Sequence, residues 1–176
     1  MSIKRKLPTP QMVKYRGIFD FPKLLKLIHT WGTAQRFEMH EKRYKHKVPD
    51  ARGAEQEVTL LGWRKIDAYL KFWISVDVKG EYLKDVDVIK DGKKKKLTQG
   101  KVRVMFNGYL ELDYQNRFES SKFLVGLRDF YHKFVVRQKI QNVWEDTLYY
   151  RLYKLNKEVR VHLDMEGKSL ASEGRW

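Results

Sequence analysis

The stretch between residues 68 and 78 constrains the fold most, because aliphatic or phenyl side chains occupy every second position along it. The apolar set is Ala68, Leu70, Phe72, Ile74, Val76 and Val78, and the intervening set is Tyr69, Lys71, Trp73, Ser75 and Asp77. Successive side chains of a strand point to opposite faces, so this period of two predicts a long strand with one buried and one solvated face. Such one-sided burial is typical of antiparallel sheets.

Turn signals predict the neighbours of this strand. Asp91-Gly92 follows the strand-like residues 86–89, and Asn107-Gly108 separates residues 102–106 from residues 109–112. Both dipeptides are favoured in two-residue hairpin turns. Two earlier strands are predicted over residues 37–47 and 57–64, with a loop over residues 49–53. The middle of the chain is therefore predicted to form an antiparallel meander.

Helical periodicity lies on both sides of this meander. Residues 21–31 carry apolar side chains at a spacing of three and four, with Pro22 in the first turn and Gly32 as a predicted stop. Apolar stripes recur over residues 123–134 and 140–159, as one kinked helix or two. The order predicts an α+β fold, an antiparallel β-meander of five to seven strands covered on one face by an N-terminal helix and one or two long C-terminal helices.

This order of elements resembles the helix-grip arrangement, in which a long C-terminal helix packs into a bent antiparallel sheet. The resemblance is architectural and implies a carrier of a small apolar ligand, held between the sheet and the helix. On that reading the cavity would be lined by Phe72, Ile74, Phe106, Leu112, Trp144 and Leu148.

The length of 176 residues fits a single domain. Residues 1–16 contain five basic residues, two prolines and no acid, which predicts a basic flexible arm. Residues 17–165 are predicted to form the single α+β domain, and residues 166–176 a flexible tail. The chain has no cysteine, no secretory signal and no apolar run of the roughly 18 residues that a membrane span requires, so a cytoplasmic protein is expected.

The net charge of +15 predicts an anionic partner. Three basic segments are the candidate contacts: the hairpin lysines Lys93, Lys94, Lys95 and Lys96; a second patch of Lys42, Arg43, Lys45 and Lys47; and the arm residues Lys4, Arg5 and Lys6. Lysine is a flexible point charge without the bidentate fork of arginine, so backbone binding is favoured over sequence readout. Nucleic acid or a ribonucleoprotein surface is the expected partner, and an anionic membrane surface is a second one.

Two aromatic residues of the best strand add a further hypothesis. Tyr69 and Trp73 lie on its expected solvated face beside Lys71, where they could stack on the bases of a single strand. A second hydrophobic core under a helix or loop is the structural alternative for these rings.

Catalytic patterns are weak in this sequence. His40 and His46 would share a strand face but lie about 20 Å apart along it, too far to hold one metal ion. Paired carboxylates such as Glu111 and Asp113 are more typical of solvated strand positions than of acid–base chemistry. No cofactor and no metal site are expected, and an enzyme is not favoured.

The sequence therefore favours a non-catalytic protein that binds a polyanion. Two alternatives remain beside the apolar-ligand carrier. One is a structural or assembly subunit, viral or from an appendage, that self-associates through exposed rings such as Tyr149, Tyr150 and Tyr153. The other is a peripheral membrane protein whose first helix, with Lys23 and Lys26 beside its apolar stripe, lies on an anionic surface.

Overall fold

The computed structural model describes residues 2–50, 53–90, 93–115, 126, 130 and 140–165. Over these residues the chain forms six strands and two α-helices, the second preceded by a π-helical turn, η2. The elements are β1 (Ile3–Lys6), β2 (Gln11–Phe19), α1 (Phe21–Ala34), β3 (Glu38–Asp50), β4 (Gly53–Lys65), β5 (Leu70–Lys90), β6 (Lys93–Leu112), η2 (Ile140–Glu145) and α4 (Asp146–His162).

The strands form one antiparallel sheet in which β6, β5, β4 and β3 are neighbours in that order. Both β1 and β2 pair with the remaining edge of β6, β1 with residues 109–112 and β2 with residues 98–106. The predicted α+β fold is confirmed in outline, with an antiparallel sheet and helices on one face of it.

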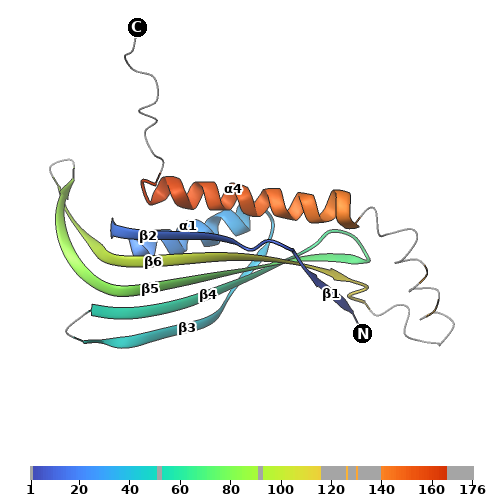
Figure 1. Cartoon of the computed structure of the whole chain (residues 1–176), viewed down its shortest axis with the longest axis horizontal. Helices are drawn as coiled ribbons and strands as arrows, with labels where there is room; N and C mark the ends of the chain where they lie inside the picture. The colour runs from blue at the N-terminus through green and yellow to red at the C-terminus, as the bar shows by residue number, and fades with distance from the viewer. Residues whose placement is uncertain are drawn as a thin grey trace, which may run out of the picture.

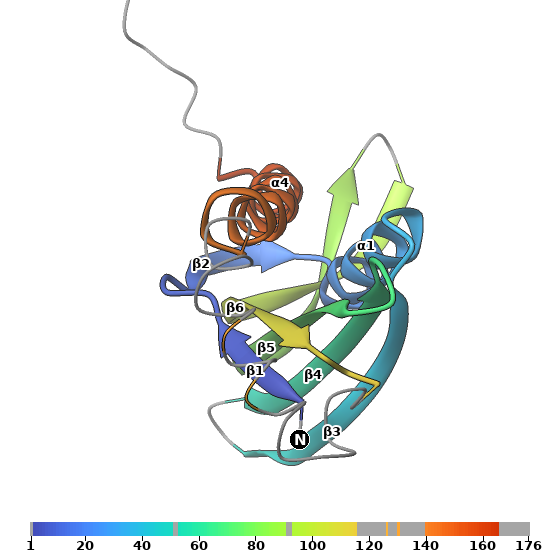
Figure 2. The same ribbon diagram turned by 90° about the vertical axis from the view of Figure 1, so that its right-hand side faces the viewer.

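The sheet is strongly bent, and α1 and α4 lie together on its concave side (Figures 1 and 2). We call this side the inner face. The even-numbered apolar residues of β5 from Leu70 to Val78 point into it and are buried, together with Val102, Val104, Phe106 and Leu110 of β6. Leu148, Leu152, Leu155 and Val159 of α4 complete the same core. The opposite, convex side is the outer face, and no described helix packs on it.

Strand β5 confirms the alternating pattern from Leu70 to Val78, and the strand is 21 residues long. The first two residues of the predicted pattern lie before the strand, where Ala68 is exposed rather than buried and Tyr69 packs against the core. Residues 86–89 belong to the same strand, because a β-bulge between Glu81 and Lys84 absorbs one extra residue without ending the pairing with β6. Lys90 and Lys93 form the last pair of this ladder. The predicted hairpin connection at residues 91–92 is therefore consistent with the pairing, although these two residues lie outside the described part.

The predicted turn at Asn107-Gly108 is wrong. Both residues lie inside β6, opposite Ser75 and Ile74, and both are buried. A Cβ at Gly108 would lie 2.5 Å from Cδ1 of Leu7 and 3.0 Å from Cδ1 of Leu152. The glycine thus permits the close approach of α4 and the β1–β2 connection to the sheet, which is a strand glycine's other common role.

The predicted flexible arm over residues 1–16 also needs correction. Residues 3–6 and most of residues 11–16 are paired strand, and Val13 is buried in the core. The two prolines, Pro8 and Pro10, lie between β1 and β2, where no ladder hydrogen bond is needed. Residues 166–176, the predicted tail, lie outside the described residues.

Helix α1 begins where predicted but ends later. The side chain of Asp20 accepts a hydrogen bond of 2.9 Å from the backbone N–H of Lys23, which caps the first turn. Gly32 does not stop the helix, which continues to Ala34. A Cβ at Gly32 would collide with Sδ of Met39, so this glycine serves the packing of α1 against β3.

The last helical segment is confirmed as α4 and begins later than the apolar stripe suggested. Residue Val143 of the preceding π-helical turn is exposed and Trp144 is partly buried. The helix predicted over residues 123–134 lies outside the described residues, except for Gly126 and Phe130, which are helical and exposed.

Candidate functional site

The four hairpin lysines do not form a one-sided cluster. Successive residues of a strand point to opposite faces, so Lys95 lies on the face opposite to Lys94 and Lys96. Lys96 is partly neutralised, because its Nζ lies 3.3 Å from Oδ2 of Asp85. Lys93 is placed only by its backbone pairing with Lys90.

The second predicted patch lies on β3, an edge strand, and faces acids. A bulge between Glu41 and Arg43 leaves Lys42 without a pairing partner in the ladder. Lys45 is opposite Glu57 and Lys47 is opposite Glu55, with Nζ of Lys47 2.9 Å from Oε2 of Glu55. Two of the four basic residues of this patch are thus opposed by acids across the strand pair, whereas Arg43 is opposite Thr59.

The third predicted segment, Lys4 to Lys6, lies in β1. Arg5 forms an ion pair of 2.7 Å with Glu145. Lys4 and Lys6 lie on the outer face, opposite Glu111 and Tyr109. The hairpin tip is at the other end of the 20-residue strand β6, roughly 60 Å away along the strand. The three predicted segments therefore do not share one contact surface.

Strand pairing instead brings together basic residues that the sequence assigned to separate segments. We name this set the basic stripe: Lys14 and Arg16 of β2, Lys101 and Arg103 of β6, and Lys84 of β5. In the register, Lys14 is opposite Arg103, Arg16 is opposite Lys101, and Lys84 is opposite Gln99. All five are exposed, and all five lie on the outer face.

The carboxylate of Glu81 contacts the basic stripe, and Glu81 is the direct cross-strand partner of Lys101. Oε1 of Glu81 lies 3.5 Å from Nη2 of Arg103 and 3.0 Å from Nζ of Lys79. The hydrogen bond from Lys79 and then the charges of Lys79, Arg103 and Lys101 hold the pKa of Glu81 below its ordinary value, against the opposing effect of burial. No described residue forms an ion pair with Lys14 or Arg16.

The stripe contains two like-charged pairs directly across strands, Lys14 with Arg103 and Arg16 with Lys101. Opposed residues of an antiparallel pair have Cβ atoms about 5 Å apart, and like charges there destabilise the sheet. The protein therefore keeps an arrangement that costs stability. An anion between the two side chains would offset that cost.

The centre of the stripe is hollow. Arg16, Lys84 and Lys101 line an open pocket of about 680 Å³, together with Tyr82, Gln99 and the backbone of Gly17 and Gly100. Among the residues that the structure describes, no acidic side chain lines it. The bulge shapes this pocket, because Tyr82 takes a left-handed conformation (φ 57°) there, and its ring lies 5.2 Å from Nζ of Lys101. The three cations and the amide can bind an anionic group, and the ring of Tyr82 can stack on a flat ring attached to that group.

A second cluster lies on the same outer face, toward the other end of the sheet. Trp63 of β4 and Trp73 of β5 are cross-strand partners with ring centroids 6.4 Å apart. Nε1 of Trp73 donates a hydrogen bond of 2.6 Å to Oε2 of Glu111, whose residue is 8% exposed. The predicted outward position of Trp73 is therefore confirmed. Tyr69 precedes β5 and packs against the hydrophobic core, so it does not extend this surface.

Three lysines surround the two indole rings. Nζ of Lys4 lies 5.0 Å from the ring centroid of Trp73, and Nζ of Lys65 lies 5.8 Å from that of Trp63. Lys71 sits deeper, 4.9 Å from Trp63, 5.4 Å from Trp73 and 4.7 Å from Tyr114. We call Trp63, Trp73 and these three lysines the tryptophan cluster. The sequence analysis did not identify Trp63. The signal that could have identified it is alternation, because Trp63 follows the buried positions Leu60 and Gly62 of β4 and therefore faces outward.

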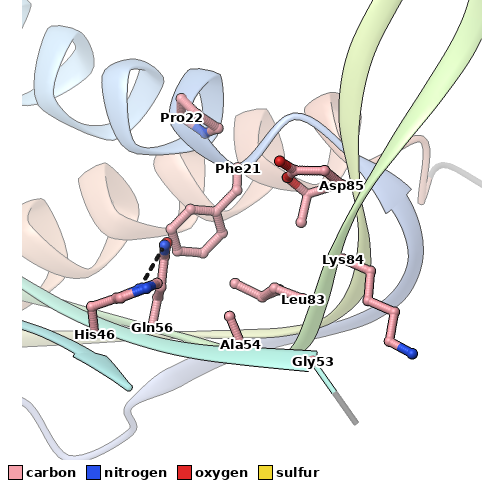
Figure 3. Close-up of a pocket in the computed structure, with 10 residues that line it drawn as sticks. Phe21, Pro22, His46, Gly53, Ala54, Gln56, Leu83, Lys84 and Asp85 are labelled. Carbon is pink, nitrogen blue, oxygen red and sulfur yellow. Dashed lines mark hydrogen bonds between the residues drawn. The ribbon is translucent and has the colours of Figure 1, made fainter. Parts of the chain in front are cut away.

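A different pocket lies on the inner face, where the bent sheet meets the first turn of α1 (Figure 3). It measures about 610 Å³ and is lined by Phe21, Pro22, His46, Gly53, Ala54, Gln56, Leu83, Lys84, Asp85 and Thr98. Nδ1 of His46 and Nε2 of Gln56 are 3.1 Å apart. Its two opposite charges and single imidazole provide neither a nucleophile with a base nor a paired acid and base.

The histidine prediction changes in one respect. His40 is opposite Leu61 on the outer face, whereas His46 is opposite Gln56 on the inner face. The bulge at Lys42 reverses the alternation between them, so they do not share a strand face as predicted. Among the described residues no group of three histidine or acidic side chains could hold a metal ion.

Comparison of the chain with protein-family models and with curated proteins gave no match. In the described part of the chain, none of the helices combines the length and the apolar character that crossing a bilayer requires.

Proposed function

We propose that this protein binds nucleic acid, without catalysis, through the basic stripe on the outer face of its sheet. The observation that carries the proposal is the pair of like-charged cross-strand contacts, Lys14 with Arg103 and Arg16 with Lys101. Phosphates of a polyanion would neutralise these pairs and release counterions, which is the main source of affinity in nucleic-acid binding. A cytoplasmic location, expected from the sequence, suits such a partner.

The membrane alternative is less favoured, because it requires the apolar face of the first helix. Phe21, Leu24, Ile28 and Trp31 of α1 are buried against the sheet. Lys23 and Lys26 remain on the solvent side, but without an apolar face beside them they supply only charge. An anchor of this kind needs buried apolar area as well as electrostatic attraction.

The carrier of an apolar ligand is also less favoured. Five of the six predicted lining residues are fully or almost fully buried, and Trp144 packs against the same core. None of the six lines the inner-face pocket, the pocket of the basic stripe or two further pockets on the described residues. The space between sheet and α4 is filled by leucines of α4 rather than left for a ligand.

The assembly alternative rests on Tyr150 and Tyr153, which are 62% and 54% exposed on α4. Size-exclusion chromatography at low and high salt separates it from the proposed function. A monomer at both salt concentrations contradicts self-association, whereas a nucleic-acid binder can remain monomeric.

The proposed function is tested by removing three charges of the stripe. The variant K14Q/R16Q/K101Q and the parent, both treated with nuclease during purification, are titrated against a labelled mixed-sequence oligonucleotide at several salt concentrations. We expect affinity at low salt to fall by about tenfold or more, and the salt slope to flatten by about 2, since each lost phosphate contact removes about 0.7–0.9 from the slope.

The matched control removes three charges from β3 in the variant R43Q/K45Q/K47Q. Two of these residues are already opposed by Glu57 and Glu55, so the affinity is expected to stay within about twofold of the parent. Equal loss in both triple variants would show that only total charge matters. An unchanged affinity of the stripe variant would contradict the proposal.

A further inference from the structure

The outer face also favours one form of nucleic acid. We propose that the ligand is single-stranded, with its phosphates along the basic edge of the sheet and its bases stacked on Trp63 and Trp73. This inference depends on the proposed function and specifies its substrate. It uses three observations: the curvature of the face, the course of the cations along it, and the geometry of the tryptophan cluster.

Helices α1 and α4 lie on the concave side of the sheet (Figure 2), and the strand register places the basic stripe on the opposite, convex side. Duplex DNA is stiff over about 150 base pairs, and bending it costs free energy. A straight duplex therefore touches a convex surface over a short length and reaches few of its cations. A single strand is flexible and can follow the curved face from end to end.

The cations of this edge form two groups on the same face, with the exposed side chain of Met12 between them. Strands β1 and β2 lie one after the other along the same edge of β6, and Lys4, Lys6, Lys14 and Arg16 all lie on their outer side. Along β6 this edge runs from Lys101, in the stripe, to Glu111, beside Trp73. These eleven residues span roughly 33 Å, a length suited to several nucleotides of an extended strand.

The two indole rings are already held in place. Trp63 and Trp73 are fixed side by side by the strand register, and the hydrogen bond to Glu111 fixes the orientation of Trp73. Nζ of Lys71 contacts the rings of Trp63, Trp73 and Tyr114, and its side chain is only 17% exposed. These contacts hold the two indole rings in their relative positions. Rings that need no reordering lose little entropy when a base stacks on them.

The two half-buried rings are covered by Lys4 and Lys65, whose ammonium groups lie 5.0 and 5.8 Å from the ring centroids. Cation–π contacts of exposed lysines are weaker than the stacking of a base on an aromatic side chain. A base is therefore expected to displace both ammonium groups. Each displaced lysine remains beside the ring, where it can pair with the phosphate of the stacked nucleotide.

The inference is tested with three labelled probes of about 12 nucleotides: an intact strand, an abasic strand of the same length, and a duplex of the same sequence. The abasic strand keeps the phosphates and lacks the bases, so it needs no change in the protein. We expect the parent to bind the intact strand about tenfold or more tightly than the abasic strand, and more tightly than the duplex.

Two variants complete the test. W73A is expected to bind the intact strand about as weakly as the parent binds the abasic one, whereas Y150A, which removes an exposed ring from α4, should leave the preference unchanged. Equal binding of intact and abasic strands by the parent, or equal binding of strand and duplex, would overturn the inference. If the stripe variant still weakened that binding, the proposed function would stand. If none of the three probes bound, both proposals would be wrong.

Discussion

The carboxylate of Glu81 neutralises part of the positive charge of the basic stripe. Glu81 accepts a hydrogen bond from Lys79 and lies beside Arg103, and these contacts lower its pKa from the ordinary value of 4.5. A carboxyl group whose pKa is lowered in the folded state stabilises the fold at pH values above its ordinary pKa. That contribution is lost as the pH falls through the folded pKa.

The variant E81Q tests this effect on stability. At pH 7 we expect it to unfold more easily than the parent, because Lys79 and Arg103 lose their shared partner. Below the pH at which Glu81 is protonated in the folded protein, the difference should shrink. Urea denaturation followed by circular dichroism at pH 7 and pH 3 measures it, and a difference that grows toward pH 3 would contradict the assignment.

The same variant should have the opposite effect on binding. Removing the carboxylate of Glu81 takes away a partner of Arg103 and one negative charge beside the stripe, while Lys79 keeps its contact with Glu57, so the affinity of E81Q for a single-stranded oligonucleotide should rise a few-fold at low salt. Glu55 on β4, which pairs with Lys47, offers a matched control, since E55Q lies outside the stripe. Weaker binding by E81Q than by E55Q would count against the stripe.

Gly53 has a backbone conformation that favours glycine over any residue with a side chain. Its φ of 123° is rarely adopted by residues with a side chain, and a Cβ there would lie 2.7 Å from the backbone carbon of Tyr82. We expect Gly53→Ala to destabilise the fold by about 2 kcal/mol or more. Gly126→Ala is the control. Gly126 is helical, and a Cβ at this position would have no described heavy atom within 4 Å. Thermal melts of the two variants should differ clearly, and equal melting temperatures would refute the requirement.

At the element scale, the pairing of β2 with β6 creates the stripe and its cost. Both strands contribute cations to the outer face, and the ladder sets them opposite each other. The pairing is nevertheless stable, because the alternate residues Val13, Phe19, Val102 and Val104 are buried on the inner face. Burial on one face therefore outweighs repulsion on the other.

A charge reversal separates these two effects. Lys14→Glu turns the pair with Arg103 into one of opposite charge, so it should stabilise the fold by about 0.2–1 kcal/mol while weakening nucleic-acid binding. Lys45→Glu does the reverse, because it sets a second acid opposite Glu57 and should destabilise the fold. Denaturation and binding are measured on both variants. If Lys14→Glu destabilised the protein, the like-charged pair would not be a cost.

The bulges in β3 and β5 act at the same scale. Each adds one residue to its strand and thereby changes which residues reach the outer face. The bulge before Arg43 moves His46 to the inner pocket, and the bulge after Glu81 keeps Lys84 in the stripe. No composition or spacing rule places such a bulge, since its position depends on both partner strands.

At the scale of the whole molecule, the net charge of +15 makes salt act in two opposite ways. Salt screens repulsion among the protein's own cations, so the melting temperature of the free protein should rise with salt. It also weakens binding of an oligonucleotide, so the stabilisation by that ligand should fall with salt.

This pair of effects gives a further prediction. A single-stranded oligonucleotide at about 100 times its Kd should stabilise the protein by about 2.7 kcal/mol, a rise in Tm of roughly 5–10 °C for a domain of this size. The rise should disappear at high salt, while the Tm of the free protein increases. Polylysine at the same concentration serves as the control and should give no rise. A ligand-induced shift that did not depend on salt would contradict phosphate contacts.

The sequence by itself determined which residues of β5 face inward between Leu70 and Val78, because alternation is local and burial follows it there. It also determined the first helix and the large positive charge. The assembly of the site was decided only by tertiary structure. Lys14 and Lys101 are 87 positions apart in the sequence, and the register of β2 on β6 makes them neighbours on one face. That register follows from packing the whole sheet against α1 and α4, which is a property of the folded chain and of no single segment.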